Sequence, residues 1–384
     1  MTDHAPAPAQ GQALTVFMFP GQGSQEKGMG GDLFDQFPEL TAQADAVLGY
    51  SIRTLCLEDP RNELNNTRFT QAALYVVNAL NHLRKMQAGG RRPDYLIGHS
   101  LGEFNALLAA GCYSFETGLR LVKKRGELMA QVSGGAMAAI LNASQDFIER
   151  TLFEAGLDDV SVANYNTPSQ LVISGPAEQL AKAEPLLRVG KTRFYPLNTS
   201  GAFHSKYMQP AQAAFAAFLE GFTFSPPTVP VIANASASAY APDAVAKGIA
   251  QQIASPVRWC ESIQGLLASA TAQGRPLNFE ELGHGDVLTR LVLAIRQQTA
   301  SPPASAAVAP APAPRAVEQR PLSAVEKIAA WNRLHPVGSR MRSLRKDYPE
   351  LETRSDAVVL FGHRAAVYMK GYSGYFDIDE LVPA

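Results

Sequence analysis

Residues 95–103, Tyr-Leu-Ile-Gly-His-Ser-Leu-Gly-Glu, decide the fold class of this chain. An apolar run typical of a short buried strand leads into Gly98, and a segment with helical composition follows Ser100 as far as Ala110. The spacing Gly98-x-Ser100-x-Gly102 is that of a tight turn between a strand and a helix. Only small residues at both glycine positions allow the backbone to make this turn, so we expect the serine side chain to project from it.

The turn predicts a nucleophile at Ser100. A serine on a strand-to-helix turn projects into a cleft, and the following helix directs its N-terminal backbone N–H groups at the place where an oxyanion develops. The alternative interpretation is an ordinary serine that caps the helix. Strand, turn and helix occur here in the order that the motif requires, which favours the nucleophile.

Strands and helices alternate around this turn. Residues 15–19 form a β-branched and aromatic run that stops at the glycine-rich segment Pro20–Gln25, as a buried strand feeding a loop does. Apolar residues recur at helical spacing from Phe69 to Met86, and a further helix is expected over Phe115–Met129. This alternation predicts an α/β fold with a largely parallel sheet.

The pattern changes after Gly134. Four short strands and two helices follow in the order β-α-β-β-α-β, which is that of a ferredoxin-like unit, and Ser144 is expected to cap the first helix. The expected strands are residues 136–141, 160–163, 170–174 and 192–197, and the expected helices are residues 145–155 and 177–187.

These patterns divide the chain into four parts. Residues 14–133 and 200–298 are predicted to form one large, α/β-hydrolase-like domain, into which the ferredoxin-like subdomain, residues 134–199, is inserted. Residues 299–317 are of low complexity and rich in alanine, proline and serine, so we predict an extended linker. Residues 318–384 contain an expected helix and three glycine-separated strands, which predict a small β-rich, SH3-like module.

The overall composition argues against several classes of protein. A net charge of −1 gives no sign of a nucleic-acid partner, and no apolar run is long enough to span a membrane. The N-terminal residues lack the basic start and apolar core of a secretory signal, so a cytoplasmic location is expected. The three cysteines are too few for a disulfide framework, and no paired spacing suggests a metal site.

A serine hydroxyl is a weak nucleophile until a base takes its proton, so the seven histidines are the candidate bases. His99 adjoins Ser100 and is a poor candidate for its base, because neighbouring side chains diverge on a sharp turn. Two further candidates lie in glycine-containing loops and remain possible bases: His204 and His284. The others lie in the N-terminal tail, within an expected helix or beyond the linker: His4, His82, His335 and His363.

Five motifs, taken in order, resemble those of the malonyl-CoA:acyl-carrier-protein transacylases. The similarity is greatest to free-standing acyltransferases that serve polyketide synthases in trans, and it covers residues 14–298. The motifs are the loop Phe19–Gln25, the turn Gly98–Glu103, the helix end Arg125–Met129, the strand Gly135–Ile140 and the tetrapeptide Ala202–Ser205.

The resemblance implies a ping-pong reaction without a metal or redox cofactor. A serine takes a malonyl group from malonyl-CoA and passes it to the phosphopantetheine thiol of an acyl carrier protein. Carried over by position, Ser100 is the nucleophile and His204 the general base, while the backbone N–H groups of Gln22 and Leu101 form the oxyanion hole. The family orients its histidine with a backbone carbonyl, for which residues 255–257 are the candidate source.

Two residues carry the implied preference for malonyl. Taken alone, Arg125 at the end of a lysine-rich helix predicts a solvated charge, whereas the resemblance makes it the partner of the free malonyl carboxylate. Phe203 lies beside the base, where its ring is expected to crowd an α-methyl branch.

Three alternative functions fit parts of this pattern. A proofreading acyl hydrolase on the same scaffold would clear acyl groups from carrier proteins, although the retained Arg125 favours transfer. An ordinary α/β-hydrolase esterase shares G-x-S-x-G, but it would need an acid between the serine and a late histidine. A non-enzymatic scaffold would have no use for both Ser100 and His204.

Overall fold

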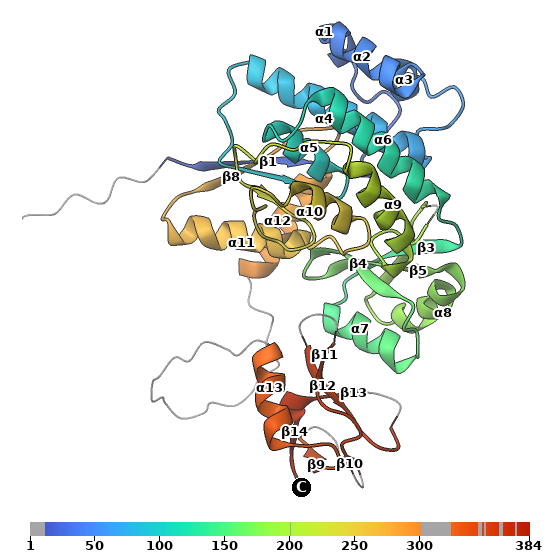
Figure 1. Cartoon of the computed structure of the whole chain (residues 1–384), viewed down its shortest axis with the longest axis vertical. Coiled ribbons are helices and arrows are strands. Elements are labelled where there is room, and N and C mark those ends of the chain that lie inside the picture. The colour runs from blue at the N-terminus through green and yellow to red at the C-terminus, as the bar shows by residue number, and fades with distance from the viewer. Residues whose placement is uncertain are drawn as a thin grey trace, which may run out of the picture. The chain divides into compact units, whose positions relative to one another are not determined.

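The computed structural model describes residues 12–199, 201–300, 324–344, 348, 351–360, 364–372 and 375–384. The chain forms two compact units, whose described parts are residues 12–300 and 324–384 (Figure 1). Among the described residues, no helix is both long and apolar enough to cross a membrane.

A four-stranded parallel sheet lies at the centre of the first unit. Its strands are arranged in the order β7-β2-β1-β8, with every neighbouring pair parallel. The strands are β1 (Leu14–Phe19), β2 (Tyr95–Gly98), β7 (Val231–Ile232) and β8 (Leu277–Glu281). The predicted α/β fold with a parallel sheet is therefore confirmed.

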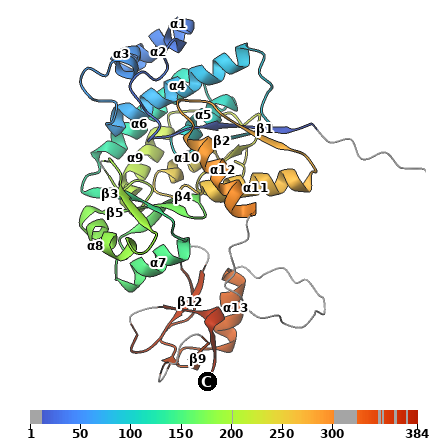
Figure 2. The ribbon, with the colours of Figure 1, turned by 180° about the vertical axis from the view of Figure 1, so that it is seen from behind.

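Both faces of this sheet are covered by helices, because β1 is apolar on both sides. Phe17 and Phe19 pack against one helical layer, whereas Val16 and Met18 pack against the other, as the alternation of side chains along a strand requires. Figures 1 and 2 show the sheet between these layers. The first layer contains α4 (Thr67–Gln87), α5 (Gly102–Ala109) and α6 (Phe115–Gln131), and the second contains α11 (Trp259–Ala272) and α12 (Val287–Ala300).

Several strands and helices of this unit are not predicted by the sequence patterns. Strand β8 has polar residues at most positions, which hides its strand character, and α1 and α3 are too short for a helical period to be recognised. Outside residues 134–199, the remaining described helices of the unit are α1 (Leu33–Gln36), α2 (Pro38–Leu48), α3 (Ile52–Leu57), η1 (Lys206–Met208), α9 (Gln209–Leu219) and α10 (Val245–Gln252).

The segment between α6 and η1 forms a four-stranded antiparallel sheet in the order β4-β5-β3-β6. The expected β-α-β-β-α-β succession is confirmed, and the hydroxyl of Ser144 accepts a hydrogen bond from the N–H of Phe147 at the start of α7. The elements are β3 (Gly135–Leu141), α7 (Gln145–Glu154), β4 (Ser161–Thr167), β5 (Gln170–Pro176), α8 (Ala177–Leu187) and β6 (Arg193–Pro196).

Alternation along these strands gives the small sheet two different faces. Ile140 and Ile173 pack beneath α7 and α8 in a core of their own. Met137 and Val172 point the other way and join the main core of the large domain. The second face is therefore one wall of the space above the nucleophile turn.

In its described residues, the second unit combines one α-helix and a short 3-10 helix with two three-stranded antiparallel sheets, ordered β10-β9-β14 and β11-β12-β13. Trp331, Met341, Val367 and Met369 form its core. Its elements are α13 (Ala324–Leu334), β9 (Arg340–Ser343), β10 (Leu351–Glu352), β11 (Val358–Leu360), β12 (Arg364–Tyr368), β13 (Tyr375–Asp377), η2 (Ile378–Glu380) and β14 (Leu381–Pro383).

The predicted linker, residues 299–317, overlaps the end of α12, which extends to Ala300. The rest of the predicted linker lies outside the described residues.

Candidate active site

The nucleophile turn places Ser100 in a left-handed backbone conformation, with φ at 51°. A residue with a side chain adopts this conformation only where the surroundings impose it. A Cβ atom on Gly98 would lie 1.9 Å from the carbonyl carbon of Gly102, and one on Gly102 would lie 1.9 Å from the carbonyl oxygen of Phe19. Both glycines are therefore required sterically, and the serine between them is the residue that projects.

Asn234 lies in the loop after β7, and its side chain holds the nucleophile turn in place. Its Oδ1 accepts a hydrogen bond from the N–H of Ser100, and its Nδ2 donates one to the carbonyl of Gly98, both at 2.7 Å. The side chain is 1% exposed. No local pattern marks Asn234, since the contact joins residues 134 positions apart.

We expect Asn234→Ala to lower the free energy of unfolding by about 2–4 kcal/mol, because it leaves a buried N–H and a buried carbonyl without partners. Urea unfolding followed by circular dichroism measures the loss. Asn278→Ala, an exposed asparagine on β8, is the control and should change stability by less than about 0.5 kcal/mol. Equal stability of the two variants would show that Asn234 is not a clamp.

His204 is the histidine that the fold brings to the serine. Its Nε2 lies 2.7 Å from Ser100 Oγ, while its Nδ1 lies 3.0 Å from the carbonyl oxygens of both Gln252 and Ser255. Carbonyls only accept, so Nδ1 carries the proton and Nε2 accepts the hydrogen bond from the serine hydroxyl. The expectation of a carbonyl from the 255–257 segment is confirmed for Ser255, and Gln252 supplies a second.

The electrostatic surroundings keep His204 neutral. Its burial, together with the nearby positive charge of Arg125, lowers its pKa to about 3. The ring is thus in the unprotonated form that a general base needs throughout the physiological pH range.

The acid limb of the pH–rate profile should therefore lie far below the ordinary histidine pKa. An unperturbed histidine with a pKa of about 6.5 would lower kcat/KM about 25-fold between pH 7 and pH 5. Because the folded pKa of His204 is lowered, we expect less than about a twofold loss over this range. Initial rates of acylation at each pH, with folding checked by circular dichroism, measure it. A decline centred near pH 6.5 would contradict this account.

The other histidines near the chain's glycine loops have different partners. His99 Nε2 lies 2.9 Å from Asn166 Oδ1. His284 Nε2 lies 3.2 Å from a carboxylate oxygen of Glu26. Among the described residues, neither of these rings forms a hydrogen bond with Ser100, which leaves His204 as the neighbouring base.

Two unpaired backbone N–H groups border the serine. Leu101 is the N-cap of α5, and Gln22 belongs to the loop after β1. A Cβ on Gly21 would lie 2.2 Å from the carbonyl oxygen of His99, so only glycine lets this loop approach the nucleophile turn. Neither the N–H of Gln22 nor that of Leu101 has a hydrogen-bond acceptor among the described residues.

Arg125 in α6 is buried, with 1% of its surface exposed, and is not the solvated charge that its lysine-rich neighbourhood predicts. Its Nη1 donates to Gln71 Oε1 at 2.6 Å and its Nη2 to Gln252 Oε1 at 2.9 Å. Nη2 also lies 3.2 Å from Ser100 Oγ. Burial lowers the pKa of the guanidinium to about 10, so it remains charged at neutral pH.

The guanidinium forms no ion pair with any described carboxylate. Glu103 is the acidic residue that the hydrogen-bond network connects to the guanidinium. Burial raises the pKa of its carboxyl group. Glu103 accepts hydrogen bonds from Gln252 Nε2 at 3.0 Å, from the N–H of Asn234 at 3.1 Å and from the Tyr240 hydroxyl. Gln252 thus bridges Glu103 and Arg125, and sequence patterns gave no sign of Gln71 or Gln252.

All six residues assigned from the sequence line one cavity of about 80 Å³. Phe203, 5% exposed, forms part of its apolar wall together with Met129, Met137 and Val172. A cavity of this size accepts a small acyl group and little more. The six residues are Gln22, Ser100, Leu101, Arg125, Phe203 and His204.

Known proteins share this arrangement of sequence and fold. The acyl transferase domain family matches residues 16–316. The polyketide biosynthesis malonyl CoA-acyl carrier protein transacylase PksC of Bacillus subtilis is 48% identical over 76% of this chain and 100% of its own length.

Solved structures agree with this likeness. The malonyl CoA-acyl carrier protein transacylase from Burkholderia pseudomallei is 65% identical, with a TM-score of 0.74 over 75% of this chain and 99% of that one. A malonyl-transacylase solved with its type II polyketide synthase acyl-carrier protein is 35% identical, with a TM-score of 0.69 over 74% of this chain and 94% of that one. The chain therefore belongs to the acyl transferase domain family, in the group of the malonyl-CoA:acyl carrier protein transacylases.

Proposed function

We propose that this protein transfers a malonyl group from malonyl-CoA to the phosphopantetheine thiol of acyl carrier proteins, in trans to a polyketide synthase. The observation that carries the proposal is the buried guanidinium of Arg125, which has no carboxylate partner among the described residues and lies 3.2 Å from Ser100 Oγ. The names of the relatives, which include a polyketide transacylase and a transacylase bound to its carrier protein, support it.

A buried cation held only by neutral amides favours an anionic ligand. Gln71 and Gln252 satisfy single N–H groups of Arg125 without supplying negative charge, and the charge of Glu103 acts on the guanidinium only through space, with no direct hydrogen bond to it among the described contacts. A carboxylate that reaches the guanidinium forms charge-assisted hydrogen bonds in a site from which water is excluded. An acyl group bound to Ser100 that ends in a carboxylate meets this requirement, and malonyl is the shortest diacid unit that can condense further.

The first half-reaction loads the serine. His204 Nε2 takes the hydroxyl proton as Ser100 Oγ attacks the thioester carbonyl of malonyl-CoA. The N–H groups of Gln22 and Leu101 donate to the oxyanion of the tetrahedral intermediate. The C–S bond then breaks, the thiolate of coenzyme A takes the proton from His204, and malonyl-Ser100 remains.

The second half-reaction transfers the malonyl group from Ser100 to the carrier protein. His204 Nε2 takes the proton of the carrier protein's thiol, whose sulfur attacks the ester carbonyl. The C–O bond to Ser100 breaks and the serine oxygen regains its proton from His204. The proposed chemistry needs no redox cofactor, because no oxidation state changes between thioester and ester, and it needs no metal, because His204 activates the nucleophile and two backbone N–H groups hold the oxyanion. A cytoplasmic location belongs to this proposal, since malonyl-CoA is formed there.

Intact-protein mass spectrometry tests the proposal. The protein is exposed separately to malonyl-CoA, methylmalonyl-CoA and acetyl-CoA, and then to a phosphopantetheinylated carrier protein. We expect a malonyl adduct in preference to the other two, followed by its appearance on the carrier protein. Loss of the adduct at the same rate with and without carrier protein would instead identify an acyl hydrolase.

A further inference from the structure

Glu103 is a buried carboxylate that the mechanism described above does not use. It lies in the first turn of α5, three residues after the nucleophile, and its side chain is fully buried. It does not line the cavity that contains Ser100, so an acyl group on the serine does not contact it. Burial of a carboxylate is costly unless hydrogen-bond donors compensate it, so its partners indicate what it does.

Two N–H donors hold one oxygen of this carboxylate as an acceptor. Glu103 Oε2 accepts hydrogen bonds from the backbone N–H of Asn234 at 3.1 Å and from Gln252 Nε2 at 3.0 Å. The Tyr240 hydroxyl donates to the other oxygen, Oε1. Because a backbone N–H can only donate, Oε2 carries no proton and presents an acceptor to Gln252.

The Gln252 side chain has one orientation that satisfies all these neighbours. On one side, its Nε2 faces two acceptors, the carbonyl oxygen of Ser100 at 2.7 Å and Glu103 Oε2. On the other side, its Oε1 faces Arg125 Nη2, which can only donate. An amide turned by half a rotation would place its oxygen against two acceptors and its NH2 against a guanidinium N–H. The neighbours therefore fix which end of the amide faces the arginine.

Both acceptors on Nε2 are needed to hold this amide. The terminal torsion of a glutamine side chain has a broad energy minimum, so contacts rather than intrinsic preference determine its angle. The Ser100 carbonyl and Glu103 together engage both hydrogens of Gln252 Nε2. The carbonyl alone engages one hydrogen and allows the amide to turn away from the arginine.

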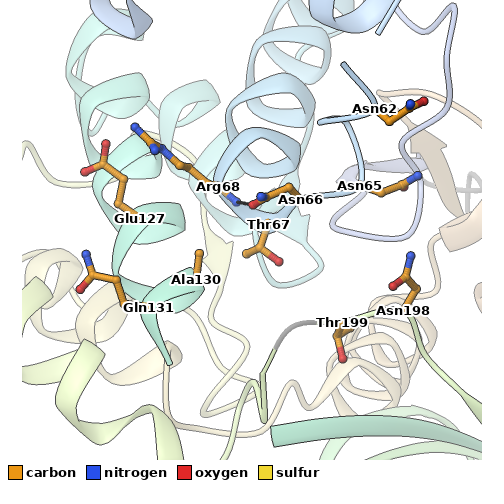
Figure 3. Close-up of a pocket in the computed structure, with 10 residues that line it drawn as sticks. All are labelled: Asn62, Asn65, Asn66, Thr67, Arg68, Glu127, Ala130, Gln131, Asn198 and Thr199. Carbon is orange, nitrogen blue, oxygen red and sulfur yellow. Dashed lines mark hydrogen bonds between the residues drawn. The ribbon is translucent and has the colours of Figure 1, made fainter. Parts of the chain in front are cut away.

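Glu127 is the acidic residue closest to Arg125 along α6, but it belongs to a different part of the structure. It borders a second, larger cavity of about 810 Å³, together with Arg68 (Figure 3). Among the described contacts, it forms no hydrogen bond with Arg125 or Gln252. The hydrogen-bonded path from a carboxylate to the guanidinium therefore starts at Glu103.

We propose that Glu103 is a positioning residue that sets the preference of the site for an acyl group ending in a carboxylate. Acting through Gln252, it keeps the amide oxygen on Arg125 Nη2, while Gln71 holds Nη1 at 2.6 Å. With one acceptor on each terminal nitrogen, the guanidinium plane stays in the orientation that a carboxylate needs for paired hydrogen bonds. The inference rests on the proposed function, because it concerns a malonyl group bound at Arg125.

The test measures the ratio of kcat/KM for malonyl-CoA to kcat/KM for acetyl-CoA, by quenched-flow mass spectrometry of Ser100 acylation. We expect Glu103→Ala to lower this ratio about fivefold to tenfold, the effect of losing one hydrogen bond. A purely structural role would lower both values together and leave the ratio unchanged, which would overturn the proposal. Glu127→Ala is the matched control and should leave the ratio within about twofold.

Glu103→Gln separates the hydrogen bonds of this residue from its charge. The glutamine oxygen can accept from Asn234 and Gln252 while its NH2 donates to the Tyr240 hydroxyl oxygen. We therefore expect this variant to keep the ratio within about twofold of the wild-type value. A loss as large as that of Glu103→Ala would overturn the proposal, because the charge and not the hydrogen bonds would then set the preference.

A double-mutant cycle tests whether Glu103 acts through Gln252. Gln252→Met removes the amide and should lower the ratio at least as much as Glu103→Ala does. Adding Glu103→Ala to Gln252→Met should then lower it by less than about twofold more, because the connection is already lost. Independent effects that multiply would overturn the proposal. Failure of the proposed function gives a different result, since no malonyl adduct would then form on the wild-type protein.

Discussion

Replacing Ser100 with alanine is expected to abolish the covalent malonyl adduct and to lower the transfer rate about 10⁴-fold or more. The serine oxygen lies 2.7 Å from the base, His204 Nε2, and is the atom that this base activates. Without it, the carrier-protein thiol would have to attack malonyl-CoA directly, with no covalent intermediate. The adduct is measured by intact-protein mass spectrometry after brief exposure to malonyl-CoA.

Ser133→Ala is the matched control for this experiment. Ser133 is exposed and lies between α6 and β3, so its loss should leave both the adduct and the rate unchanged. Circular dichroism of the Ser100 variant excludes unfolding as the cause of inactivity. A malonyl adduct that persists at the same mass in the Ser100 variant would move the nucleophile to another residue.

Replacing Arg125 with alanine is expected to lower kcat/KM for malonyl-CoA by about 10²- to 10³-fold. Truncating one partner of a buried, hydrogen-bonded charge pair costs about 3–5 kcal/mol, and the malonyl carboxylate would be that partner. Acetyl-CoA has no carboxylate to lose, so its kcat/KM should stay constant or rise. The ratio of the two values is the measurement, because it cancels any general loss of folded protein.

Arg120→Ala supplies the control on the same helix. Arg120 is exposed and pairs with Glu116, one turn away in α6. Its loss should leave the ratio of malonyl to acetyl kinetics within about twofold. If Arg125→Ala also left both rates in place, the guanidinium would not be the partner of the malonyl carboxylate.

Local patterns were sufficient for the parts of the fold that they describe. The strand at 95–98 and the helix after Ser100 follow from a short apolar run and a glycine-bounded turn. The ferredoxin-like subdomain follows from six successive periodic segments, and α8 begins and ends where it was expected, at Ala177 and Leu187. Such features depend on neighbours within a few residues, which is why a single sequence reveals them.

Features that depend on distant parts of the chain were not predicted. Asn234 contacts Ser100 across 134 positions, and Gln252 contacts Arg125 across 127. Gln71 looks like any polar residue of an amphipathic helix until α4 and α6 pack together.

Arg125 shows most clearly which features of the site the sequence determines and which the tertiary structure decides. The sequence by itself determined the residue types of the site, the turn that exposes Ser100 and, through resemblance, the family. It could not determine whether Arg125 faces water, because its neighbours Lys123 and Lys124 predict a solvated helix end. The tertiary structure decided this point, since packing of α4 and α10 around α6 removes the guanidinium from water and leaves two glutamines as its partners. A buried guanidinium with no described carboxylate in direct hydrogen-bonding contact is a property of that packing.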